Sequence, residues 1–106
     1  MILVVESARF RRILPEIYNI LPILDDVFAM HGQDCVITSA NDRVHMKNSL
    51  HYIDRALDLR SQTLPSGSEE IVVNEIRDAV GLDYDVLFED QDTPNEHIHI
   101  EFDPKG

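Results

Sequence analysis

Residues 49–60 read SLHYIDRALDLR, and the second half of this stretch predicts a β-strand. Over residues 55–60 the side chains alternate between two faces, which places Asp58 on one face and its neighbours Leu57 and Leu59 on the other. Asp58 is therefore a carboxylate within an apolar strand. A buried carboxylate without a partner is costly, so Asp58 needs a metal, a cation or good hydrogen bonds.

A second stretch near the C-terminus, EHIHIEFDP at residues 96–104, carries further imidazoles and carboxylates. It predicts another strand, in which His97 and His99 share one face and the isoleucines share the other. Together with Asp58 and with His51 in the first stretch, these imidazoles are donors of the kind that a hydrolytic zinc site uses. Such a site takes three protein ligands, leaves one position for water, and adds a carboxylate that moves protons.

The spacing between His51 and Asp58 favours a loop followed by a strand. On a straight helix, residues seven apart share a face but lie roughly 10 Å apart along the axis. Side chains separated in this way cannot easily converge on one ion with bonds of about 2.0–2.2 Å. If His51 ends a loop at residues 40–50 and Asp58 lies in the next strand, the chain can turn between them. Glu96 begins the last strand beside a turn at residues 91–95, so it need not follow the alternation and can lean over the metal.

The rest of the chain predicts two helices and two more strands. Apolar residues recur at helical spacing over residues 13–31, where Pro22 is expected to kink or divide the helix. A second helix is predicted over residues 69–80, with Ser66 or Ser68 as its N-cap and Gly81 at its end.

The predicted strands cover residues 34–39, 55–60, 84–89 and 96–102, and residues 1–12 fit either a short edge strand or the lead into a helix. This order of elements predicts a single α+β domain over residues 1–106. We expect a small antiparallel sheet with helices packed on one face and a zinc site on the sheet.

Composition excludes some function classes. The formal net charge of −11 argues against electrostatic binding to nucleic acid or to an anionic membrane surface. The apolar run at the N-terminus ends at Glu6, so neither a signal peptide nor a transmembrane helix is expected. The single cysteine, Cys35, fits a small buried hydrophobe and synthesis in a reducing cytoplasm.

The two stretches resemble the zinc D-Ala-D-Ala metallopeptidase family, which includes D-alanyl-D-alanine carboxypeptidases and the L-alanyl-D-glutamate peptidases of phage endolysins. The family motif Ser-x-His-x6-Asp is matched by Ser49, His51 and Asp58, with Ala56 inside it, and its second motif, an acidic residue three positions before a histidine, is matched by Glu96 and His99. The likeness covers roughly residues 34–103. Asp54 stands where the family usually has a glycine.

By this resemblance, His51, Asp58 and His99 would bind Zn²⁺, and Glu96 would be the catalytic general base. Arg43, His45 and Ser49 would contact the substrate. His97 would stay off the metal, because a fourth protein ligand would fill the tetrahedral shell and leave no position for water.

The function implied is hydrolysis of peptidoglycan stem peptides, at either the D-Ala-D-Ala or the L-Ala-D-Glu bond. A monomer is expected, although the sequence does not determine the oligomeric state. An endolysin-like enzyme is made in the cytoplasm and acts at the cell wall after release by a holin. Two alternatives remain open: a non-catalytic, zinc-stabilised structural or binding module of a phage particle, and an α+β interaction domain without a metal.

Overall fold

The computed structural model describes residues 1–5, 14–40 and 55–104. In chain order its elements are β1 (Ile2–Val4), α1 (Pro15–Met30), β2 (Cys35–Ser39), β3 (Ala56–Arg60), α2 (Glu69–Val80), β4 (Tyr84–Glu89) and β5 (His97–Phe102). The predicted helices and strands are confirmed, each within two residues of its expected ends. For the N-terminal segment, whose conformation the sequence leaves open, the structure shows a short strand at residues 2–4.

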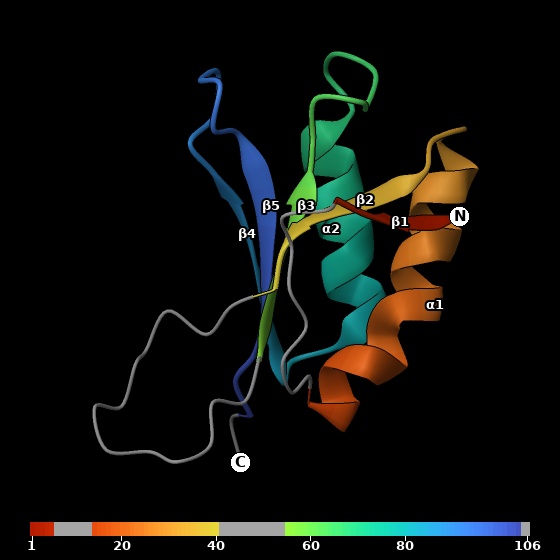
Figure 1. Cartoon of the computed structure of the whole chain (residues 1–106), viewed down its shortest axis with the longest axis vertical. Helices are drawn as coiled ribbons and strands as arrows, with labels where there is room; N and C mark the ends of the chain where they lie inside the picture. The colour runs from red at the N-terminus through yellow and green to blue at the C-terminus, as the bar shows by residue number, and fades with distance from the viewer. Residues whose placement is uncertain (6–13, 41–54, 105–106) are drawn as a thin grey trace.

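The five strands form one sheet in the order β1-β2-β3-β5-β4. β1 runs parallel to β2, and all other neighbouring strands are antiparallel. Seen along the sheet in Figure 1, both helices lie on the same side of it. The α+β class, with a mainly antiparallel sheet and helices on one face, is therefore confirmed.

Alternation along the strands separates the face that the two helices cover from the face that they do not cover, which is called the open face. On β3 and β5, Leu57, Leu59, Ile98 and Ile100 are fully buried beneath the helices. The helices contribute their own apolar stripes to this core: Ile17, Ile20, Leu24, Val27 and Phe28 from α1, and Val72, Val73 and Ile76 from α2. The residues between the buried strand positions, Asp58 and His99 among them, therefore point to the open face.

Two expectations about the helices hold only in part. Of a kink or a division at Pro22, the division is wrong, because α1 runs unbroken from Pro15 to Met30. Pro22 has no N–H to donate to the carbonyl of Tyr18, four residues earlier in the helix. Tyr18 is 63% exposed, so water can solvate this carbonyl. Ser68 precedes α2 but does not cap it with its side chain, because its hydroxyl donates to the carbonyl of Pro65 at 2.6 Å instead.

Other features agree with the sequence. Gly81 ends α2 with a φ of 88°, a conformation that glycine adopts without strain. Cys35 is fully buried, and burial raises the pKa of its thiol to about 12, which makes it unreactive.

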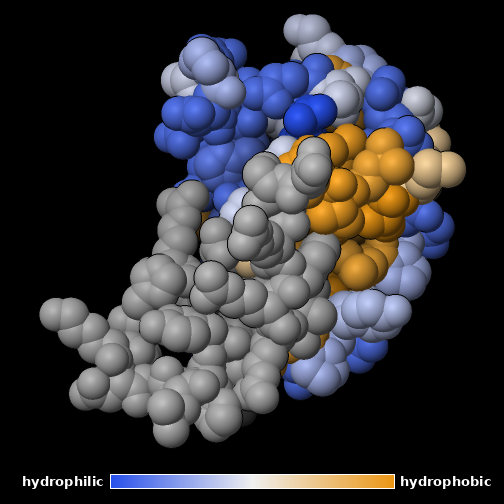
Figure 2. Space-filling model, in the orientation of Figure 1, coloured by the Kyte–Doolittle hydropathy of each residue, from blue (hydrophilic) through white to orange (hydrophobic). Residues whose placement is uncertain are grey.

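Two further observations concern the exposed edge of the sheet and the length of the helices. The edge strand β1 leaves Leu3 and Val4 partly exposed, and Figure 2 shows an apolar patch where Figure 1 draws this strand. Within the described residues, neither helix is long and apolar enough to cross a membrane.

Candidate metal centre

The pairing of β3 with β5 brings Asp58 and His99 together. Their Cα atoms are direct partners in the antiparallel register, and both side chains point to the open face. Nδ1 of His99 lies 2.7 Å from Oδ1 of Asp58. The carboxylate in the apolar strand thus has an imidazole as its partner, as the need for a compensating group predicted.

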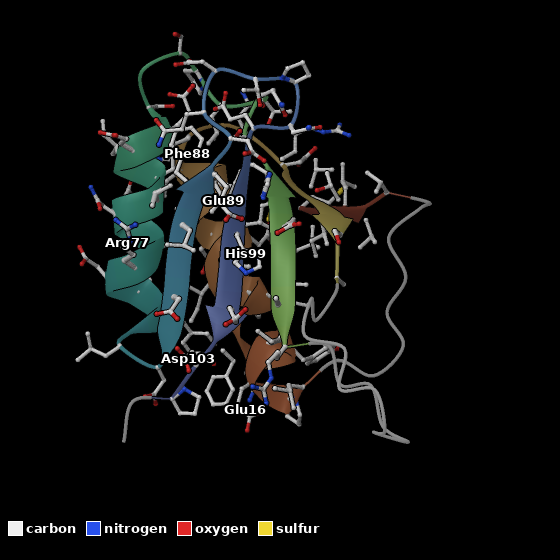
Figure 3. The ribbon with its side chains drawn as sticks, turned by 90° about the vertical axis from the view of Figure 1, so that its left-hand side faces the viewer. Glu16, Arg77, Phe88, Glu89, His99 and Asp103 are labelled. Atoms are coloured by element: carbon white, nitrogen blue, oxygen red, sulfur yellow. The ribbon has the colours of Figure 1, made fainter. Side chains whose placement is uncertain are left out.

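β4 adds a carboxylate that the sequence analysis did not propose. Glu89 is the last residue of β4 and is paired with His97. Its Oε1 atom lies 3.0 Å from Nε2 of His97 and 3.9 Å from Nδ1 of His99. Figure 3 shows Glu89 and His99 on neighbouring strands of the sheet face that is turned away from the helices.

Asp58, Glu89 and His99 form a possible metal-binding group. One donor atom from each residue lies within 4.8 Å of the other two. His99 is buried, with 8% of its surface exposed, and the two carboxylates are partly buried. A mixed set of imidazole and carboxylate donors suits a divalent ion such as zinc, so the chemistry of this group fits a metal.

The carboxylates also affect the protonation of both histidines. The hydrogen bond with Asp58 is the main reason that the pKa of His99 is raised, and burial opposes it. For His97, burial lowers the pKa, but the carbonyl of Asn95 and the carboxylates of Asp58 and Glu89 together outweigh burial and raise it. Without a metal, the site therefore favours protonated imidazoles.

The second ring nitrogen of each histidine also has an oxygen partner. Nδ1 of His97 lies 2.6 Å from the carbonyl oxygen of Asn95, in the turn before β5. Nε2 of His99 lies 3.5 Å from Oε1 of Glu101, two residues along the same strand. Histidines that bind metals typically donate their other N–H to such a carbonyl or carboxylate.

Glu96 takes a direction that the family motif does not specify. Its Oε1 accepts a hydrogen bond of 3.1 Å from the hydroxyl of Ser61, a fully buried residue, and its Oε2 accepts one of 3.4 Å from the Asp92 amide. Glu96 nevertheless lines a hollow of about 450 Å³ together with Asp58 and His97. The hollow lies beside the turn between β4 and β5, where the surface in Figure 2 is mainly polar.

The structure describes only part of the site that the sequence predicts. The structure brings Asp58 and His99 together and places Glu96 on a hollow that Asp58 also lines. His51, Arg43, His45 and Ser49 lie outside the described residues.

The sequence does contain a signal for Glu89, the donor that was missed. β4 and β5 are joined by one short turn, so an antiparallel hairpin must pair the end of the first strand with the start of the second. Glu89 then lies opposite His97 on the face that carries the histidines.

A second group of carboxylates lies further along the same strands. Asp85, Glu101 and Asp103 also offer donor atoms within 4.8 Å of one another. This group contains no imidazole, and exposed acidic residues often gather without an ion. It serves below as a control for the mixed site.

Comparison with known proteins gives no match: no family model, no curated protein and no solved structure resembles this chain closely enough to assign it.

Proposed function

We propose that this protein is a zinc-dependent peptidase that hydrolyses peptidoglycan stem peptides, as the resemblance to endolysin and carboxypeptidase sequences implies. The observation that carries the proposal is the direct pairing of Asp58 with His99 at 2.7 Å, because these residues come from the two motifs that the resemblance links. The hollow beside them supports a substrate site, since Asp58 and Glu96 both line it.

In this proposal Asp58 and His99 are two of the zinc ligands, and an imidazole is the third. The resemblance would give that third place to His51, while His97 is the imidazole that the described structure places 3.8 Å from Asp58. Zinc, when bound, supplies a Lewis acid and lowers the pKa of a coordinated water. Glu96 would take a proton from that water and give it to the leaving amine, and the Ser61 hydroxyl orients its carboxylate through a hydrogen bond of 3.1 Å.

A second candidate function is a non-catalytic module stabilised by zinc, such as a structural part of a phage particle. Two observations favour it. Glu89 and His97 add two donors beside Asp58 and His99, which is enough to fill a tetrahedral shell. Glu96 is also already engaged by Ser61 and the Asp92 amide.

Cleavage of purified stem peptides distinguishes these functions. The wild-type protein with zinc should release products, and chelation should abolish release. Glu96→Gln keeps an oxygen that Ser61 can bond, and it should lose on the order of 10²–10⁴-fold in turnover while keeping its zinc. Asp78→Asn, which changes an exposed carboxylate on α2, serves as the control and should keep full activity. A protein that binds zinc but cleaves neither type of bond would exclude the peptidase and favour the structural module.

A further inference from the structure

We propose that four side chains of the open sheet face hold the metal ion, with His97 as the third donor and Glu89 as a fourth donor that can be displaced. The donor atoms are Oδ1 of Asp58, Nδ1 of His99, Nε2 of His97 and Oε1 of Glu89. This inference rests on the metal centre of the proposed function and names its ligands, but it does not require peptidase activity.

Four of the six distances between these donors are close to those in a zinc coordination shell: Asp58 to His99 is 2.7 Å, His99 to Glu89 is 3.9 Å, Glu89 to His97 is 3.0 Å, and His97 to Asp58 is 3.8 Å. Donor atoms of Asp58, Glu89 and His99 lie within 4.8 Å of one another, and His97 extends this group from the side of Asp58 and Glu89. Tetrahedral bonds of about 2.0–2.1 Å place neighbouring donors about 3.3 Å apart. Two of the four distances are shorter than this and two are longer, so small side-chain rotations would equalise them around an ion.

The hydrogen bonding of His97 prepares its Nε2 atom for a metal. A carbonyl oxygen can only accept a hydrogen bond, so the 2.6 Å contact with Asn95 places a proton on Nδ1. The other nitrogen of the neutral ring then carries a lone pair, and it faces Asp58 and Glu89. A backbone carbonyl that fixes the tautomer in this way is a typical outer partner of a metal-binding histidine.

Glu89 is the donor that can leave most easily. Its side chain is 34% exposed, compared with 15% for Asp58, 13% for His97 and 10% for His99. It ends β4, and the next residue, Asp90, begins the turn with a φ of 53°. Glu89 also lines a hollow of about 520 Å³ between α2 and β4, together with Arg77 and Glu70, so it has space on the side away from the metal.

The consequence is a site with a closed and an open form. With Glu89 bound, four protein donors fill the tetrahedral shell. With Glu89 displaced into the hollow, Asp58, His97 and His99 remain as three donors, and a water or a substrate oxygen can take the fourth position. Retention of the metal does not require His51 in either form.

The test uses the full chain, stripped of metal by a chelator and titrated with Zn²⁺ and then with Co²⁺, which reports tetrahedral binding by its visible absorption. We expect one ion per chain. His97→Gln and Glu89→Gln should each lower the affinity more than about tenfold, which is the lower limit for residues that merely orient a ligand. His51→Ala should bind zinc as the wild type does.

Asp85→Asn is the matched control for Glu89→Gln, because both carboxylates lie on β4 and point to the same face. It should leave the affinity unchanged. A large loss in this variant would instead place the ion among Asp85, Glu101 and Asp103 and overturn the proposal. Loss of zinc by His51→Ala with retention by His97→Gln would overturn it in favour of the ligand set that the resemblance implies.

A measurement on the wild type guards against variants that do not fold. Zinc should shift the NMR signals of the ring nitrogens of both His97 and His99, with Nε2 of His97 and Nδ1 of His99 as the bound atoms. An unchanged His97 ring would overturn the four-donor site. Zinc binding without hydrolysis of stem peptides would leave this inference standing and remove only the peptidase. No binding at all would remove both.

Discussion

The two faces of the sheet are built from the same strands and serve different purposes. On β3 and β5 the helix-covered face carries leucine and isoleucine side chains that are fully buried. One residue further along each strand, the open face carries Asp58 and His99 in direct contact. Because alternate residues point to opposite faces, a slip of one residue would exchange the two sets.

This comparison indicates that the core positions the candidate site. Burial of Leu57, Leu59, Ile98 and Ile100 selects one register between β3 and β5. The same register sets Asp58 opposite His99, although that contact lies on the other side of the sheet. The apolar face therefore provides the rigid support that a metal centre needs, and the predictions below test each face against the other.

The largest expected effect is the loss of stability when a leucine is truncated on the helix-covered face, compared with the same change on the open face. Leu57→Ala removes a fully buried side chain and should lower the free energy of unfolding by about 2–5 kcal/mol. Leu87→Ala, on the open face of β4, removes a side chain that is 45% exposed and should cost no more than about 0.5 kcal/mol. Urea unfolding of the two variants measures the difference. Equal losses would mean that the open face is covered in solution.

Removal of zinc should have the next largest effect, because the proposed ion joins β3, β4 and β5. With free zinc at 100 times its dissociation constant, binding stabilises the folded state by about 2.7 kcal/mol. For a domain of this size that corresponds to a rise in Tm on the order of 10 °C. Thermal melts with zinc and with a chelator should differ by this amount, and Asp58→Asn should lose the difference. Superimposable wild-type melts, with removal of zinc verified by metal analysis, would contradict a metal that supports the fold.

The pH dependence of stability should change sign when zinc is added. In the metal-free protein the carboxylates raise the pKa of His97 and His99, so their contribution is fully present below the unfolded value of about 6.5. It is lost as the pH rises through the raised folded values. Zinc instead requires deprotonated imidazoles, so its contribution grows as the pH rises through the same range.

Melting temperatures measured between about pH 6 and pH 9, a range above the carboxylate pKa values, test this reversal. The metal-free Tm should fall with pH, and the difference between zinc-bound and metal-free Tm should widen. Asp58→Asn should flatten the metal-free curve, because it removes the main hydrogen bond that raises the pKa of His99. A metal-free curve that rises with pH would mean that other groups control the stability in this range.

The sequence predicted those features that depend on local periodicity. Helical spacing located both helices, and alternation located the strands and assigned His99 and Asp58 to polar faces. The need for a partner to Asp58 follows from elementary electrostatics, and the structure supplies His99. These inferences succeeded because each depends on residues close together in the chain or on the energetic cost of one buried charge.

Features that depend on which side chains meet across a turn or between strands were not predicted. The position of Glu89 depends on the register of the β4–β5 hairpin, whose turn uses non-glycine residues at positive φ, Asp90 and Asp92. The direction of Glu96 depends on Ser61, which lies 35 residues away in sequence and offers a hydroxyl at the end of β3. The parallel pairing of β1 with β2 likewise brings together segments that no local pattern connects.

The smallest effect concerns the polar contact between Ser61 and Glu96. Ser61 is fully buried, and its hydroxyl donates to Glu96 at 3.1 Å. Ser61→Ala should lower the free energy of unfolding by about 1 kcal/mol, because Glu96 is partly exposed and keeps the Asp92 amide as a donor. Ser68→Ala removes an exposed hydroxyl that donates to Pro65, and its cost should stay within about 0.5 kcal/mol.

The same pair of variants tests how Glu96 is used. The Ser61 hydroxyl orients the Glu96 carboxylate, so in a peptidase Ser61→Ala should lower turnover, while Ser68→Ala should keep it. Zinc content measured alongside should stay unchanged in both variants. A loss of stability without a loss of turnover would mean that the Ser61–Glu96 contact supports the fold alone.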